Sequence, residues 1–380
     1  MPSNLNRLSK IAKFLISSNL SSPITLQDFH AKALADYGIN DCWPEAVLKE
    51  AKTKKENISK EKDALETFPV VNIDGEDAKD FDDAIFCEFS DHGFHLKVAI
   101  ADVSFYVKEG SALDLEAAKR TTSVYMPKKV VPMLPEKLSN ELCSLQPNKR
   151  RRCLCIEMDF NKDGYIRSYK FHRGIIKSVA RLTYTEVENQ IINGVKDTDY
   201  AESLKAAIAL FNKLLINKGY RGALDFTISE PFIQTNSNGD IKHIDDRKRL
   251  SSHKLIEEFM LAANISAADF ISQYAKEGVY RIHEHPESLK IQRLSQVLKN
   301  RGINWNGSIE DIENISEFIL KLNKRDDAPI LNMLILQSMQ RAEYSTINKG
   351  HFGLKFDKYT HYTSPCLLYT SPSPRDALTS

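Results

Sequence analysis

Acidic residues crowd one short stretch of the chain, between Ile73 and Ala84. Five of these twelve residues are aspartate and one is glutamate, and four of the aspartates follow the pattern D-x5-D-x-D-D. Carboxylates this close repel one another, and a divalent cation is the usual way in which a folded chain offsets the repulsion. Carboxylate oxygens are hard ligands that suit Mg²⁺ or Mn²⁺. The pattern therefore predicts a metal site, and a metal site rich in carboxylates indicates phosphoryl chemistry.

The motif by itself also fits a solvated acidic loop or a calcium-stabilised turn, and the spacing leaves these alternatives open. Other side-chain types offer no competing metal centre. The histidines His283, His285, His351 and His361 lack suitable spacing, so we expect them to pack or form hydrogen bonds. Cys153 and Cys155 form a C-x-C without a partner pair, which makes a zinc site unfavourable.

The aspartates are expected to lie in a loop that enters a central β-strand. Residues 69–73 form an apolar run that leads into them. Residues 84–89, a turn at Asp91-His92-Gly93, and a second strand over residues 94–107 predict a β-hairpin immediately afterwards. Loops at the ends of strands often present catalytic groups.

Helical patterns follow later in the chain. Residues 250–276 place apolar side chains on one face and the polar pair Glu257 and Glu258 elsewhere, which predicts a long helix. Residues 286–300 and 309–347 are also expected to be largely helical. Strands followed by long helices predict the α+β fold class.

Composition is that of an ordinary soluble globular protein. Apolar residues make up 42% and charged residues 27% of the 380 residues, a length that suits roughly two to three domains. No apolar run approaches the ~18–20 residues of a membrane span, and charges interrupt the region where a signal peptide would be apolar. We expect no membrane partner, free thiols and a cytoplasmic location. The net charge of +1 requires any nucleic-acid contact to use locally concentrated charge.

Several long motifs carry a resemblance to a known family. In chain order they are VVNIDGEDAKDFDDAIFCEF, VAIADVSFYV, TSVYMPKKVVPMLPEKLSNELCSLQP, ARLTYTEV, HKLIEEFMLAANISAA and GHFGLKFDKYTHYTSP. From about Trp43 to Pro365 the chain resembles the RNB (ribonuclease II/R) family. The resemblance implies a catalytic domain with a mixed β-sheet core flanked by long helices. It also implies a Mg²⁺-dependent exoribonuclease that hydrolyses single-stranded RNA processively in the 3′→5′ direction to nucleoside 5′-monophosphates.

The resemblance assigns roles to the acidic cluster. Asp74, Asp80, Asp82 and Asp83 match the four active-site aspartates of the family, which would hold one or two Mg²⁺ ions, or Mn²⁺. Asp80 and Asp82 are expected to act most directly in catalysis, with Asp82 positioning the metal and the water. Asp77 lies outside the matched set and is expected to be structural.

Four further residues are implied to bind RNA. Tyr125, Tyr184 and Phe226 match aromatic residues of the family that contact RNA, and bases stack on such rings. Glu258 resembles a residue that contacts the 3′-terminal ribose, where a carboxylate can accept a hydrogen bond from the 2′-hydroxyl. The basic run at residues 149–152 could track phosphates, but we expect it to be a solvated loop.

The chain also departs from the family pattern. After Y-T-S-P the family continues with an isoleucine and two basic residues, the first an active-site arginine, whereas Cys366 follows Pro365 here. We therefore expect a fragment truncated at both ends. Residues 1–65 would be a helical segment and polar linker, residues 66–365 an incomplete catalytic domain, and residues 366–380 a tail foreign to the protein. Weak or no activity is expected for the chain itself.

Two other functions stay open. One is a non-catalytic RNA-binding or regulatory member of the same family, and the other is a metal-dependent phosphatase of small molecules. The complete aspartate quartet favours the enzyme, and the aromatic positions argue against the phosphatase. In either RNA-binding case we expect a monomer with single-stranded RNA as its partner.

Overall fold

The computed structural model describes residues 26–56, 58, 68–226, 230–236, 241–247, 249–275, 277–305, 307–308 and 312–363. These residues fall into two compact units. The smaller unit comprises the described parts of Met1–Trp43, Val124–Val131 and Pro231–Asp246, and the larger one those of Pro44–Ser123, Pro132–Glu230 and Arg247–Ser380. The helical pattern predicted near the N-terminus lies largely, and the tail 366–380 entirely, outside the described residues.

The smaller unit is built from short elements. They are the helix α2 (Leu26–Asp36), the hairpin of β4 (Val124–Met126) and β5 (Lys129–Val131), and most of the ribbon of β9 (Glu230–Thr235) and β10 (Ile241–Arg247). The Lys129 ammonium contacts the Asp41 carboxylate at 2.8 Å, which ties the β4–β5 hairpin to the segment after α2.

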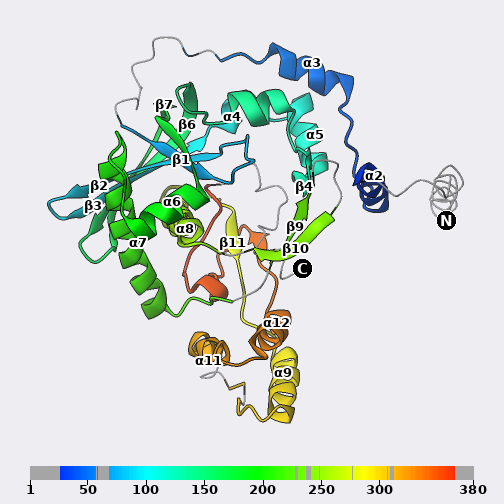
Figure 1. The fold of residues 1–380 in the computed structure, drawn as a ribbon, viewed down its shortest axis with the longest axis vertical. Helices are drawn as coiled ribbons and strands as arrows, with labels where there is room; N and C mark the ends of the chain where they lie inside the picture. Colours follow the sequence, from blue (N-terminus) through cyan, green and yellow to red (C-terminus); the bar gives the residue numbers. More distant parts are fainter. Residues whose placement is uncertain are drawn as a thin grey trace, which may run out of the picture. The chain divides into compact units, whose positions relative to one another are not determined.

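A six-stranded sheet forms the centre of the larger unit (Figure 1). Its strands are β1 (Val71–Asp74), β2 (Asp83–Ser90), β3 (Gly93–Ala101), β6 (Arg150–Asn161), β7 (Ile166–Lys177) and β8 (Ala180–Thr183). Their order is β7-β6-β3-β2-β1-β8, and only the β1–β8 pair is parallel, so the sheet is mixed. Short turns join the antiparallel pairs β2–β3 and β6–β7, as is usual for strands that are neighbours in sequence.

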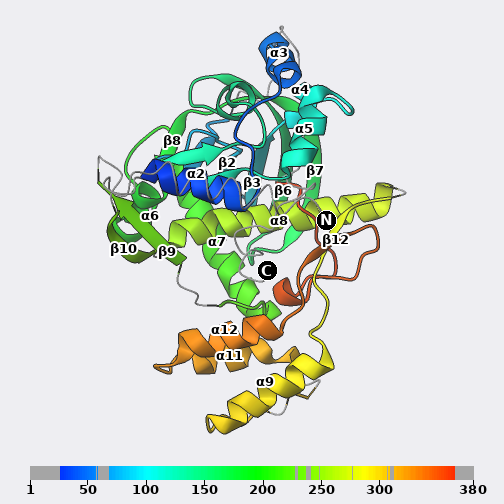
Figure 2. The same ribbon diagram turned by 90° about the vertical axis from the view of Figure 1, so that its right-hand side faces the viewer.

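Three helices cover one face of this sheet. They are α6 (Tyr184–Asn193), α7 (Ala201–Arg221) and α8 (Ser251–Tyr274). Apolar side chains of the strands and of these helices form one buried cluster, in which Ile156, Leu96 and Phe259 have no measurable exposure. Figure 2 shows α8 lying across the strands. Its start contacts α6 through Ser252, and Phe270 near its end packs on Phe171 of β7.

The remaining elements of the larger unit surround this core. They are α3 (Glu45–Thr53), α4 (Val103–Tyr106), α5 (Ala112–Arg120), the π-helical turn η1 (Lys137–Leu142), β11 (Tyr280–Ile282), α9 (Ser288–Asn300), α11 (Ile315–Leu322), α12 (Ala328–Ser338), β12 (Glu343–Ser345) and the 3-10 turn η2 (Phe352–Leu354). The helices α9, α11 and α12 share an apolar cluster of their own around Leu298, Ile315 and Leu331.

The predicted fold class is confirmed, since a mixed sheet flanked by long helices is present, and the helix predicted over residues 250–276 is α8. Two local predictions were wrong. The second hairpin strand ends at Ala101 and a helical turn follows, and the basic run begins strand β6. The described part of residues 309–347 is largely helical as predicted, through α11 and α12, but it ends in strand β12. Among the described helices, none is long and apolar enough to cross a membrane.

Candidate functional site

The strand pairing gathers the aspartate cluster at one edge of the sheet. Asp74 is the last residue of β1 and Asp83 is the first of β2, and the two strands are antiparallel neighbours. Asp80 and Asp82 lie in the loop that connects them. The structure thus brings the four predicted aspartates together around a single strand-to-strand connection.

Mutual repulsion and burial perturb the carboxyl groups at this edge. Burial, followed by repulsion from Asp80 and Asp74, raises the pKa of Asp82 to about 7. Burial, followed by repulsion from Asp74 and Asp82, raises the pKa of Asp83 to about 8. Residue Asp82 as a whole is more exposed than Asp83, although protein atoms surround its carboxyl group, and its pKa is the less raised of the two. The pKa of Asp74 is also raised, chiefly by burial, although the Gly75 N–H donates to its carboxylate.

The donor set suits a hard divalent cation. Asp83 Oδ2 is buried and has no hydrogen-bond partner, so an acceptor is left without a donor at the acidic edge. Within the described part of the chain, no three carboxylate, histidine or cysteine side chains converge on one metal position. Mg²⁺ is usually held by one or two carboxylates, with water and substrate phosphate completing its shell. The edge therefore fits Mg²⁺ shared with a phosphate better than an all-protein metal cage.

Strand β8 fixes the start of the acidic loop. Asp74 pairs with Thr183 in the parallel register, and the Arg181 guanidinium donates to the carbonyls of Gly75 and Glu76. These contacts leave the Asp74 carboxyl at the strand end and hold the backbone that turns away from it.

Tyr184 lies directly after the residue that pairs with Asp74. It is the first residue of α6, and Thr183 caps that helix by accepting from the Glu186 N–H. The Tyr184 ring stacks on the His253 ring of α8, with centroids 4.1 Å apart and an interplanar angle of 29°. The register thus places a half-buried aromatic pair next to the acidic edge. The sequence did not predict His253, which is 69 residues away from its ring partner.

Glu258 and its neighbour Glu257 both contact Lys218 but lie on different faces of α8. Glu258 is only 4% exposed, and its carboxylate lies 3.1 Å from the Lys218 ammonium. It lines a cavity of about 490 Å³ together with Arg221. The Glu257 side chain is also largely buried, at 7% exposure, and contacts both Arg249 and the same Lys218 ammonium. It lies four residues after His253, so it shares the helix face that carries the aromatic pair. Helical spacing in H-K-L-I-E-E is the signal that could have singled out Glu257.

The two other predicted aromatic residues lie elsewhere. Phe226 is partly buried and packs on the apolar cluster of α9, α11 and α12. Tyr125 lies on strand β4 and is 66% exposed, so its ring is accessible to a base. It belongs to the smaller unit, whereas the four aspartates belong to the larger one.

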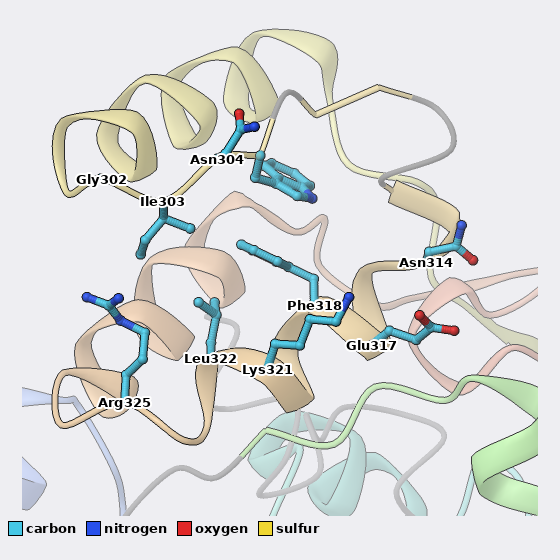
Figure 3. A pocket seen from close by; sticks show the side chains of 10 residues that line it. Gly302, Ile303, Asn304, Asn314, Glu317, Phe318, Lys321, Leu322 and Arg325 are labelled. Atoms are coloured by element: carbon cyan, nitrogen blue, oxygen red, sulfur yellow. The ribbon is translucent and has the colours of Figure 1, made fainter.

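A separate cavity of about 450 Å³ opens beside α11 (Figure 3). Lys321, Phe318 and Asn314 on α11 and at its N-cap face it, together with Asn304 and Arg325. None of the eight residues predicted for the site lines this cavity. The cavity therefore plays no part in the arrangement of the aspartates.

Comparison with known sequences gives one family and many relatives. A model described as the RNB domain matches residues 62–370. Ribonuclease R of Escherichia coli (strain K12) is 40% identical over 348 residues, covering 89% of this chain and 43% of the relative. Ribonuclease R of Thermotoga maritima is 40% identical over 341 residues, covering 86% of this chain and 48% of the relative. The chain therefore spans less than half the length of these curated relatives.

A solved structure shows the same arrangement of elements. Mycoplasma genitalium RNase R, in complex with ribose-methylated single-stranded RNA, superposes with a TM-score of 0.83 at 29% sequence identity. The match covers 89% of this chain and 54% of that one.

Proposed function

This chain belongs to the RNB domain family, and from that premise we propose that it carries the acidic centre of a Mg²⁺-dependent 3′→5′ exoribonuclease. Its substrate would be single-stranded RNA, degraded processively to nucleoside 5′-monophosphates. The observation that carries the proposal is the gathering of Asp74, Asp80, Asp82 and Asp83 at one sheet edge, where three of the carboxyl pKa values are raised. We also propose a cytoplasmic monomer.

The four aspartates would divide the work of phosphodiester hydrolysis. Mg²⁺, when bound, would neutralise them and polarise the scissile phosphate. Asp83 and Asp74, which sit at the strand ends, would anchor the cation. Asp80 and Asp82 lie in the loop, and the Asp82 carboxylate can accept a hydrogen bond from the attacking water and orient it. Asp82 is therefore the residue on which we expect the chemistry to depend most.

RNA would be held by aromatic stacking and by a carboxylate at the ribose. We propose base contacts for Tyr184, Tyr125 and Phe226, of which Tyr184 is supported by its place beside the acidic edge. Glu258 stays a candidate for the ribose contact, but the shared face with His253 favours Glu257. Leu367 stands where the resemblance places the family's active-site arginine, and this leads us to propose weak hydrolysis by this chain.

The substrate class can be tested with three substrates under single-turnover conditions, in which weak hydrolysis is still measured. We expect the protein with Mg²⁺ to degrade a single-stranded RNA oligonucleotide but neither the DNA of the same sequence nor p-nitrophenyl phosphate. Hydrolysis of p-nitrophenyl phosphate alone would support a phosphatase. Binding of RNA without any hydrolysis would support the non-catalytic alternative and contradict the proposal.

Replacing Tyr184 with alanine should weaken binding of single-stranded RNA, because one base loses its stacking surface. Stacking of a base on an aromatic ring contributes about 1–3 kcal/mol, so Kd should rise roughly 5- to 150-fold. Fluorescence anisotropy with a labelled oligonucleotide measures this change. Tyr184→Phe keeps the ring and should bind as the wild type does. An equal loss in both variants would show that the hydroxyl, and not the ring, is what matters.

The adjacent glutamates form a matched pair for a test of sugar recognition. We expect Glu257→Gln to reduce the preference for RNA over DNA about tenfold, since a neutral amide is a weaker partner for a ribose 2′-hydroxyl. Glu258→Gln should leave this preference unchanged, because Glu258 points away from the helix face that carries His253. Competition binding with the two oligonucleotides measures the ratio. The reverse pattern would restore Glu258 as the ribose contact.

A further inference from the structure

Ser144 has no role in the proposed chemistry, but its side chain forms hydrogen bonds to the backbone of the acidic loop. Its side chain is completely buried, and it follows the π-helical turn η1. The Ser144 hydroxyl donates to the Lys79 carbonyl at 2.8 Å and accepts from the Phe81 N–H at 3.1 Å. Those two groups belong to the peptide units immediately before and after Asp80. One hydroxyl therefore fixes the backbone on both sides of a predicted metal ligand.

Two further hydrogen bonds hold the backbone of the rest of the loop. The Leu145 N–H donates to the Phe81 carbonyl at 2.8 Å, and the Ala101 N–H donates to the Asp82 carbonyl at 2.9 Å. The peptide units from Lys79 to Asp83 are thus anchored by Ser144 and Leu145, which follow η1, and by the end of β3. The side chains of Asp80 and Asp82 keep access to solvent while their backbone is held.

Arg151 of strand β6 holds the backbone of Ser144 in turn. Arg151 is only 4% exposed, and its Nε donates to the Ser144 carbonyl at 2.9 Å. The same guanidinium contacts the Glu56 carboxylate. Because Arg151 is tied at several points, the Ser144 backbone has a fixed place relative to the sheet. The chain of contacts runs from the sheet, through Arg151 and Ser144, to the backbone around Asp80.

We propose that Ser144 is a positioning residue that sets the placement of the Asp80 and Asp82 carboxylates and thereby the divalent-cation affinity of the site. This inference rests on the proposed function, because it takes the aspartates to be cation ligands. Groups that orient metal ligands commonly change metal affinity or activity by about 10- to 100-fold when they are removed. Ser144 acts through the backbone and contacts neither cation nor substrate.

The test compares cation binding in three proteins, using Mn²⁺ detected by electron paramagnetic resonance in the absence of RNA. We expect Ser144→Ala to bind Mn²⁺ about 10- to 100-fold more weakly than the wild type. Ser144→Cys, which keeps a weak donor of similar size, should lose less. Ser338→Ala is the matched control, since Ser338 is also buried but donates to the Ile335 carbonyl in α12. This control should bind Mn²⁺ as the wild type does.

RNA hydrolysis provides a second readout. High Mg²⁺ should restore the rate of Ser144→Ala towards that of the wild type, while RNA affinity stays unchanged throughout. A folded Ser144→Ala protein with wild-type Mn²⁺ affinity would overturn the inference, and so would an equal loss in Ser338→Ala. A wild type that binds Mn²⁺ but hydrolyses no RNA would contradict the proposed function, and the Mn²⁺ affinities would still decide the role of Ser144.

Discussion

Replacing Asp82 with asparagine is expected to reduce the rate of RNA hydrolysis by at least about 10²–10³-fold, the usual loss when one electrostatic stabiliser of a transition state is removed. The amide has nearly the same shape but carries no charge, so it neither attracts a cation nor orients the attacking water as a carboxylate does. Asp82 and Asp83 both have strongly raised pKa values. Of these two residues Asp82 is the more exposed, so substrate can reach it more easily. Single-turnover rates with an excess of protein measure the effect.

Asp77 provides the control for this substitution. It lies in the same loop and is exposed, but it is outside the D-x5-D-x-D-D pattern. Asp77→Asn removes the same charge from the same loop and should change the rate less than about twofold, since exposed charges interact weakly through water. RNA affinity should be similar in both variants. Equal losses in the two variants would mean that total negative charge, and not a specific site, determines activity.

Divalent-cation binding should strengthen as pH rises from 6 to 9. The pKa values of about 7 for Asp82 and about 8 for Asp83 mean that protons occupy the site near neutral pH and must leave before a cation can bind. Removing Mg²⁺ with a chelator should therefore matter most at high pH. We expect the rate of RNA hydrolysis in Mg²⁺ to fall steeply below about pH 7. Isothermal titration calorimetry in two buffers with different ionisation enthalpies should show that protons are released when Mg²⁺ binds.

Protonation of Asp82 and Asp83 also determines how the stability of the metal-free protein changes with pH. The folded-state pKa values lie above the ordinary value of 3.8, so between about pH 4 and 8 the folded state binds more protons than the unfolded state. The metal-free protein should lose stability as pH rises through this window, and Mg²⁺ should raise Tm more at pH 9 than at pH 6. Asp83→Asn should flatten both trends. A Mg²⁺ affinity that does not vary with pH would contradict these expectations.

The acidic edge was predictable because its geometry is local. Asp74 and Asp83 are separated by one short loop between antiparallel strands, so the strand pattern of residues 69–89 already places them together. The helix α8 was also predictable, since its apolar face repeats regularly over residues 250–276. Both features depend on neighbours in sequence, and local patterns carry that information.

Features that depend on distant contacts could not be predicted. The hydrogen bonds of Ser144 join it to Lys79, 65 positions away in the sequence, and to Phe81, 63 positions away. The choice between Glu257 and Glu258 depends on how α8 is rotated against its neighbours, and adjacent residues on a helix point about 100° apart. The apolar run over residues 94–107 favoured one strand, but Asp102 is buried at its end, where it contacts Arg173 and starts the turn of α4.

The central claim is that the aspartate edge uses Mg²⁺ to remove nucleotides from the 3′ end of RNA. The most direct measurement follows one single-stranded RNA carrying a label either at its 5′ end or in its last internucleotide phosphate, with Mg²⁺ at pH 8. We predict that the terminal label leaves first as a mononucleotide and that the 5′-labelled strand shortens stepwise. Both changes should vanish in Asp82→Asn and in the presence of a chelator. Internal cleavage products, or hydrolysis that persists in either control, would contradict the claim.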